Sequence, residues 1–192
     1  MTLRSIACTL VLMASTAAFG ALKAGDPAPA FSAPASLAGK PFTYSLKDSL
    51  AKGPVVVYFY PSAYTEGCNI QAHAFSTRAD QFAAAGATVI GVSLDSIERL
   101  NEFSADPDYC AGKLAVASDG EGKIARAFGL RVSGVHRGAI DTRGKEIDHG
   151  FTERTTFVVK RDGTVLAAVG GVLPEANVTR ALELVQKLST AR

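Results

Sequence analysis

Residues 55–68 read Val-Val-Val-Tyr-Phe-Tyr-Pro-Ser-Ala-Tyr-Thr-Glu-Gly-Cys. The first six are apolar or aromatic without interruption, which is typical of a strand buried on both faces of a parallel sheet. Pro61 ends that run. Apolar residues recur at helical spacing from Cys68 to Ala83, so we predict an amphipathic helix over 68–85, with Gly86 as its C-terminal cap.

Strand and helix patterns alternate along the rest of the chain. We predict strands over 42–46, 87–94, 114–117, 155–159 and 164–169, and helices over 96–103, 122–128 and from Pro174 onward. The prolines of residues 24–34 indicate an extended arm. Residues 131–150 are polar and rich in glycine, so we predict a long surface loop or a small hairpin there.

This alternation predicts an α/β fold in which helices flank a central mixed sheet. Parallel strands need crossover connections, and their helices cover the sheet faces. The Asp-Gly step at 162–163 predicts an antiparallel hairpin between the last two strands. A closing hairpin of this kind indicates a thioredoxin-like sheet.

The first 20 residues have the order of a secretory signal peptide. Arg4 supplies a positive charge, an apolar stretch runs to Phe19, and the small residues around Gly20 suit a signal peptidase. The apolar stretch is shorter than the roughly 20 residues of a membrane span, which favours cleavage after Gly20 over a membrane anchor. Export then places residues 21–192 in the bacterial periplasm or outside the cell.

Residues 21–192 number 172 (192 − 20), which suits one domain with a substantial core. The whole chain carries 20 basic and 18 acidic side chains, so there is no electrostatic case for a nucleic acid or a membrane as partner. Cys8 lies in the signal peptide, which leaves Cys68 and Cys110 after export. Two cysteines are few for a disulfide scaffold, so a catalytic or redox use has to be tested against a structural one.

Cys68 is the candidate nucleophile. It follows the carboxyl end of the buried strand, where sites form in open α/β sheets, and it lies in the first turn of the next helix. A helix N-terminus favours the thiolate, which is the reactive form of cysteine. Lowering a thiol pKa from about 8.5 to about 6 takes roughly 3 kcal/mol, whereas a helix end typically supplies about 0.3–1 kcal/mol. A cation is therefore expected close by.

The chain resembles the peroxiredoxins, the family of alkyl hydroperoxide reductase and thiol-specific antioxidant. Their signature Pro-x-x-x-Thr-x-x-Cys matches Pro61, Thr65 and Cys68. Residues 24–31 resemble the opening of the family, 117–119 its middle segment, and 153–159 the strand that carries its active-site arginine. Residues 65–68, Thr-Glu-Gly-Cys, are close to the Thr-Pro-Gly-Cys of the bacterioferritin-comigratory subgroup.

The resemblance implies a thiol-dependent peroxidase that reduces hydrogen peroxide and organic hydroperoxides through a sulfenic acid on Cys68. It also implies that Thr65 hydrogen-bonds the peroxide, that Pro61 shields the thiolate and that Arg154 is the expected cation. A guanidinium presents several donors in fixed geometry to oxygens that gain charge as the O–O bond breaks. The implied partners are a hydroperoxide and an external thiol or thioredoxin-like reductant, for a monomer or homodimer without a cofactor.

Two positions depart from the family pattern. Gln71 stands where many relatives have a glutamate that helps to hold the arginine, and it keeps the hydrogen bond without the charge. His73 stands where some members of the subgroup have a resolving cysteine in the same helix. Cys110 is the remaining internal partner, in a polar, turn-like segment that predicts access rather than burial. The alternative is a one-cysteine mechanism that an external thiol resolves.

His136 and His149 lie in the 131–150 loop together with Asp141, Glu146 and Asp148. These residues lack the spacing of metal ligands, so we predict a solvated loop without a metal site. Tyr64 could either line the mouth of the active-site pocket or pack as an ordinary aromatic residue, and the sequence does not distinguish the two.

Two other functions fit the same fold. A thioredoxin-like thiol-disulfide oxidoreductase needs two cysteines separated by two residues, and Thr65 stands in place of the first. A redox-inactive binding module needs none of the motif, because a fold alone does not determine function. The combination of Pro61, Thr65, Cys68 and Arg154 favours the peroxidase over both.

Overall fold

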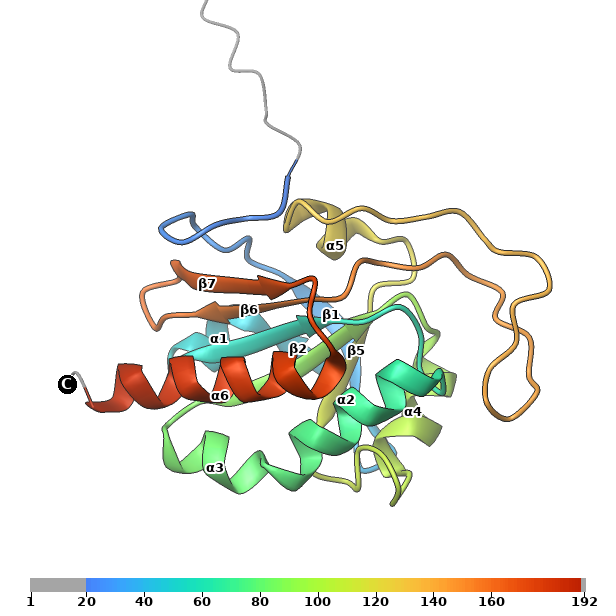
Figure 1. Cartoon of the computed structure of the whole chain (residues 1–192), viewed down its shortest axis with the longest axis horizontal. Coiled ribbons are helices and arrows are strands. Elements are labelled where there is room, and N and C mark those ends of the chain that lie inside the picture. Colours follow the sequence, from blue (N-terminus) through green and yellow to red (C-terminus); the bar gives the residue numbers. More distant parts are fainter. Residues whose placement is uncertain (1–19, 191–192) are drawn as a thin grey trace, which may run out of the picture.

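A computed structural model describes residues 20–190, and its centre is a seven-stranded mixed sheet (Figure 1). The strands lie in the order β2-β1-β5-β4-β3-β6-β7. Their bounds are β1 Ser32–Leu37, β2 Lys40–Ser45, β3 Val55–Phe59, β4 Thr88–Ser93, β5 Ala115–Ser118, β6 Thr155–Val159 and β7 Val165–Gly170. β4 pairs in parallel with β3 and β5, and the other neighbours pair antiparallel.

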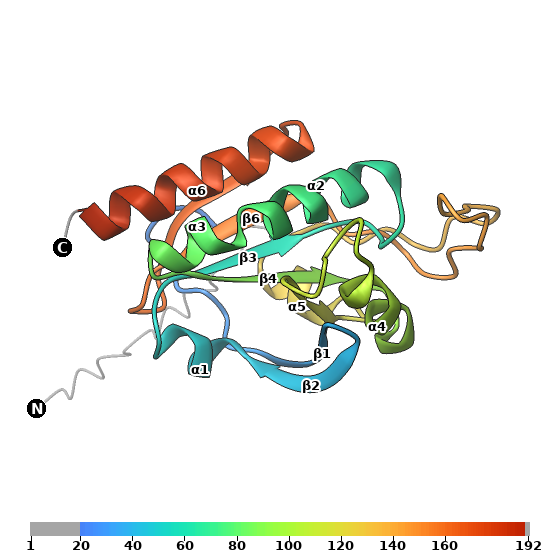
Figure 2. The same ribbon diagram turned by 90° about the horizontal axis from the view of Figure 1, so that it is seen from below.

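Helices cover both faces of this sheet (Figure 2). One face carries α2 Glu66–Thr77, α3 Ala79–Ala84, α4 Ile97–Ala105 and α6 Pro174–Thr190. The other carries the short helices α1 Leu46–Leu50 and α5 Lys123–Ala127. The predicted mixed sheet with flanking helices is confirmed, as are the antiparallel β6–β7 hairpin and the start of the last helix at Pro174.

β3 is the central support of the fold, and all five of its residues are buried. Val55, Val57 and Phe59 pack on the α1 and α5 side, whereas Val56 and Tyr58 pack on the α2 and α6 side. Burying one such side chain contributes about 1.5–3 kcal/mol, so an apolar run with two covered faces can only be a central strand. The loop that leads to Cys68 therefore starts from the best-buried strand of the sheet.

The sequence patterns predict only half of the N-terminal hairpin: the strand expected over 42–46 corresponds to β2, whereas β1 is not expected. β1 pairs antiparallel with β2 and β5, although residues 24–34 predict only an extended arm. Ala38 and Gly39 join β1 to β2, and both have positive φ, at 52° and 75°. Two-residue hairpin turns require such angles, but alanine rarely adopts them, so the turn signal is weak.

The helix predicted over 68–85 is divided in two at Arg78, whose φ and ψ of −105° and 8° are not helical. Ser76 and Thr77 precede the break, and both hydroxyls donate back to the carbonyl of His73, at 3.0 and 2.9 Å. Hydroxyls that bond to the preceding turn weaken and bend helices. Ser76 also donates to the carbonyl of Tyr109 at 2.7 Å, which ties the bend to the segment of Cys110.

The predicted signal peptide covers residues 1–20, of which 1–19 lie outside the described residues. Within 20–190, no helix combines the length and apolar character that crossing a membrane requires. The same residues hold no group of three or more His, Cys, Asp or Glu side chains placed to bind a metal ion.

Candidate active site

Cys68 lies in the first turn of α2, as predicted, and only 1% of it is exposed. Thr65 is the N-cap residue, and its carbonyl accepts hydrogen bonds from the backbone N–H groups of Cys68 and Asn69 at 2.9 and 2.8 Å. These are the first hydrogen bonds of α2, so the helix begins directly before Cys68. The sulfur therefore lies at the N-terminus of α2, where the helix dipole has its positive end.

Arg154 lies against the sulfur, where the sequence predicts a cation. Its Nη2 donates to Cys68 Sγ at 3.3 Å. The register of β6 against β3 brings Arg154 close to Cys68. Thr155 pairs with Phe59, so the arginine lies beside the end of β3. A Cβ atom on Gly67 would lie 3.1 Å from Arg154 Nη2, so glycine leaves room for this approach. The guanidinium and the N-terminus of α2 can together attract a negative charge on the sulfur.

Gln71 holds the arginine from the other side. Its Oε1 accepts a hydrogen bond from Arg154 Nη1, and its Nε2 donates to Asn177 Oδ1 at 3.0 Å. Thr156 also donates to Asn177 Oδ1, at 2.5 Å, and Asn177 donates to the carbonyl of Val169 at 2.8 Å. A glutamate could accept from Arg154 but could not donate to Asn177, so this neutral chain of bonds suits glutamine.

Thr156 and Asn177 are therefore site residues that the sequence reasoning missed. Asn177 is fully buried, and it lies on the apolar face of α6 with Val178 and Ala181. The sequence signal that could have identified Asn177 is a polar residue among the apolar positions of the helix, because a buried amide needs hydrogen-bond partners.

The loop from Pro61 to Thr65 carries the other predicted site residues. Pro61 is half-buried at the start of the loop. The Thr65 hydroxyl donates to the carbonyl of Ser62 at 2.9 Å, which leaves its oxygen able to accept a hydrogen bond from a peroxide. Tyr64 has a φ of 61°, a left-handed conformation that costs a bulky residue roughly 1–2 kcal/mol. Surrounding contacts must hold this strained loop in place.

Residues 24–168 match the AhpC/TSA family. This chain belongs to that family, the peroxiredoxins. Peroxiredoxin Bcp of Escherichia coli (strain K12) is 34% identical over 146 residues, which are 70% of this chain and 88% of the relative. The match confirms the resemblance to the bacterioferritin-comigratory subgroup. As a peroxiredoxin, the protein is a thiol-dependent peroxidase.

Solved structures of peroxiredoxins have the same fold. Peroxidoxin BcpB from Mycobacterium tuberculosis has a TM-score of 0.71 at 28% identity, with 87% of this chain and 98% of that chain covered. The bacterioferritin comigratory protein of Xanthomonas campestris has a TM-score of 0.64 at 27% identity, with 81% and 91% covered. These similarities confirm the thioredoxin-like peroxiredoxin fold.

Cys110 of this peroxiredoxin is fully buried, so the predicted access is wrong. It belongs to the same apolar cluster as Cys68. Burial, and after it the charge of Asp106, raise the pKa of the Cys110 thiol, so this cysteine stays protonated at neutral pH.

The 131–150 segment is a long loop without regular strands, but the prediction that it is solvated is wrong for two of its ionisable groups. Asp141 is 5% exposed and lies 2.9 Å from Arg99 and 3.2 Å from Arg143. His149 Nε2 lies 2.9 Å from Asp95 Oδ1. Burial opposes a charge on His149, but the hydrogen bond and charge of Asp95 outweigh it and raise the pKa of the histidine. Ionic pairing thus docks the loop on the domain.

Tyr64 packs in the protein interior and does not line an open pocket. It is 2% exposed, its ring makes edge contacts with Phe103 and Tyr109, and the Arg143 guanidinium lies 3.3 Å from the ring centre. An arginine over an aromatic face adds an electrostatic attraction to the packing.

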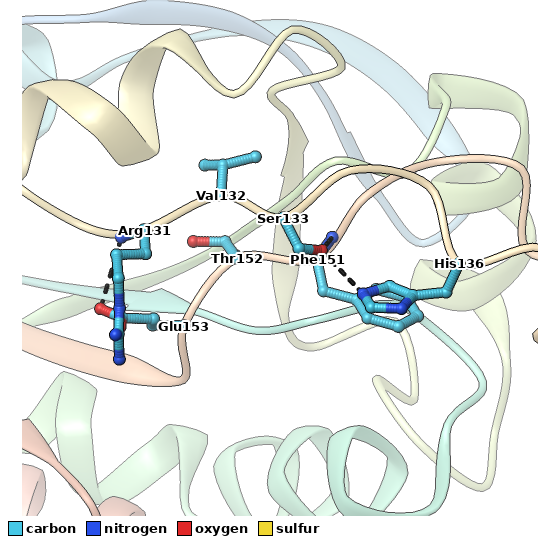
Figure 3. Close-up of a pocket in the computed structure, with 7 residues that line it drawn as sticks. All are labelled: Arg131, Val132, Ser133, His136, Phe151, Thr152 and Glu153. Atoms are coloured by element: carbon cyan, nitrogen blue, oxygen red, sulfur yellow. Dashed lines mark hydrogen bonds and ion pairs between the residues drawn. The ribbon is translucent and has the colours of Figure 1, made fainter.

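A surface hollow of about 450 Å³ lies beside the segment that precedes Arg154 (Figure 3). Arg131 and Glu153 pair at one end, and the His136 ring stacks on Phe151 at the other, with centroids 4.9 Å apart. None of the predicted site residues lines it. The candidate site around Cys68 is therefore separate from this hollow.

Proposed function

We propose that this peroxiredoxin reduces hydrogen peroxide and alkyl hydroperoxides at Cys68. The observation that carries the proposal is the 3.3 Å contact between Arg154 Nη2 and Cys68 Sγ at the N-terminus of α2. The solved Xanthomonas campestris relative is described by its alkyl peroxide reduction activity, which supports the same class of substrate here.

In the first step, the Cys68 thiolate attacks one oxygen of the peroxide. The S–O bond forms as the O–O bond breaks, and the departing oxygen takes a proton to leave as water or an alcohol. Cys68 is oxidised to a sulfenic acid while the peroxide is reduced by two electrons. Arg154 donates to the oxygens that gain charge, and the Thr65 hydroxyl accepts from the peroxide O–H.

In the second step, Cys110 condenses with the sulfenic acid. The S–S bond forms, the S–O bond breaks, and the hydroxyl leaves as water with the thiol proton. A thioredoxin-type protein or another external thiol then supplies two electrons and restores both thiols. A disulfide needs the two Cα atoms within about 7 Å, and both cysteines are buried, so we infer that the start of α2 and residues 106–113 open locally when the disulfide forms and is reduced.

The disulfide is tested by mixing reduced protein with one equivalent of hydrogen peroxide and mapping its peptides by mass spectrometry. We expect an intramolecular link between Cys68 and Cys110. Cys110→Ser is the matched control: it should keep the rate of the first reaction within about threefold, whereas its Cys68 should remain a sulfenic acid with one equivalent of peroxide and proceed to sulfinic acid only when a second equivalent is added. Wild-type protein that retains Cys68 as sulfenic or sulfinic acid, with Cys110 still free, would favour the one-cysteine mechanism instead.

We also infer that the protein works in the bacterial periplasm or outside the cell. The signal-peptide pattern of residues 1–20 supports this location. Cell fractionation followed by N-terminal sequencing checks it, with a mature chain that begins at Ala21 as the expected result. A cytoplasmic protein that keeps Met1 to Gly20 would contradict the inference.

A further inference from the structure

The active-site loop is held by its backbone. The carbonyl of Ala63 accepts from Arg99 Nη2 at 2.8 Å, and the N–H of Ala63 donates to Asp95 Oδ2 at 2.7 Å. The next carbonyl, that of Tyr64, accepts from the N–H and the hydroxyl of Thr142, both at 2.8 Å. Three side chains and one backbone N–H from elsewhere in the chain therefore hold consecutive peptide groups directly before Thr65 and Cys68.

Arg99 links three separate parts of the chain. Besides Ala63, its guanidinium lies 2.9 Å from Asp95 Oδ1 and 2.9 Å from Asp141 Oδ2. Both carboxylates are fully buried, and only 14% of the Arg99 side chain is exposed. The arginine thus joins the β4–α4 connection and the tip of the long loop to the active-site loop. An Arg fork can hold several oxygens in fixed directions, which a single ammonium cannot.

Asp95 is the second residue that holds the active-site loop. Its Oδ1 also accepts from the Ser62 hydroxyl at 2.9 Å, and its Oδ2 accepts from Ser93 at 2.7 Å. His149 shares Oδ1. The carboxylate and Arg99 therefore hold the peptide groups on both sides of Ala63, next to a residue whose left-handed backbone does not persist without such support.

We infer that Arg99 is a positioning residue of the peroxidase reaction. It holds Ala63 and so sets where Thr65 and Cys68 stand relative to Arg154, although no contact joins Arg99 to the sulfur. The inference rests on the proposed role of Cys68. Reactions that depend on oriented groups lose rate steeply when those groups move by about 1 Å, so release of the loop should slow the peroxide reaction selectively.

The test compares Arg99→Met with Arg161→Met. Arg161 likewise donates to a loop carbonyl, that of Ala51 at 3.0 Å, and serves as the matched control. The rate constant of the first reaction with hydrogen peroxide is measured per folded molecule, with the folded fraction taken from chemical unfolding. We expect Arg99→Met to lower it about 10–100-fold, and Arg161→Met to leave it within about threefold. Arg99→Lys should recover part of the loss.

A second readout separates positioning from stability. Alkylation of Cys68 by iodoacetamide needs neither Thr65 nor Arg154 to be oriented on a substrate, so it should fall much less than the peroxide rate in Arg99→Met. Equal changes in both rates, or an unchanged peroxide rate in a destabilised variant, would overturn the inference. Should Arg99→Met not fold, the peroxide and alkylation rates are compared in Arg99→Lys instead. Thr142→Val is compared in the same way with Thr142→Ser. Unchanged peroxide rates in these variants again count against the inference.

Failure of the inference and failure of the proposed function give different results. Cys68→Ser is measured beside the Arg99 variants. If Cys68→Ser still consumes peroxide, the proposed function is wrong. If Cys68→Ser is inactive while Arg99→Met reacts at the wild-type rate, only the positioning role of Arg99 is wrong.

Discussion

Serine in place of Cys68 is expected to abolish peroxide turnover and leave the fold intact. The substitution exchanges one sulfur for one oxygen at a buried position beside Arg154, so the packing changes little. A hydroxyl is not ionised near neutral pH and does not form a sulfenic acid, and the two-electron reduction of the peroxide then has no acceptor. We expect peroxide consumption with dithiothreitol as reductant to fall by at least about 10³-fold.

Cys110→Ser is the matched control for this loss, because it also replaces a buried cysteine by serine. It should consume peroxide with dithiothreitol, since that small dithiol can reduce a sulfenic acid directly. Chemical unfolding of both variants tests whether the fold is kept. Turnover by Cys68→Ser at a rate near that of Cys110→Ser would show that the nucleophile is another group.

Arg154→Met is the second variant with a large expected effect. Methionine fills similar space but removes the donor 3.3 Å from the sulfur and the donor that Gln71 accepts from. Loss of one preorganised donor to developing charge typically costs about 10²–10³ in rate, or about 2.7–4 kcal/mol. We therefore expect the rate constant of the first peroxide reaction, followed by stopped-flow, to fall by about that factor or more.

Arg154→Lys shows whether charge or geometry matters more. An ammonium restores the charge but not the planar fork that reaches Cys68 and Gln71 together, so partial recovery is expected. A methionine variant that reacts within about threefold of the wild-type rate would mean that the helix end alone activates Cys68. In that case Arg154 would have a structural role only.

The sequence predicts the central part of this site because its signals are local. An unbroken apolar run of this length and composition is typical of a strand covered on both faces, and proline, threonine and cysteine at the observed spacing place Cys68 at a helix start. The meeting of Arg154 with Cys68 is not local, because it depends on the pairing of β6 with β3. Family resemblance predicts it, whereas the charge requirement predicts only that some cation is near.

Burial and long-range polar contacts are what the sequence does not predict. The polar neighbours of Cys110 suggest access, but His73 and Ser76 bind its segment onto α2 and turn the sulfur inward. His149 lies far along the chain from its partner Asp95, and no spacing rule joins them. Such pairings are set by tertiary packing, which local propensity and periodicity do not encode.

In the proposed reaction, the sulfur of Cys68 is the atom that takes oxygen from the peroxide. The most direct measurement mixes reduced protein with one equivalent of hydrogen peroxide in the presence of a sulfenic-acid trap and locates the adduct by peptide mass spectrometry. We predict one adduct, on Cys68, that grows in step with peroxide loss and is most abundant in Cys110→Ser. Peroxide loss with no adduct on Cys68, or with the adduct on Cys110 alone, would contradict the claim.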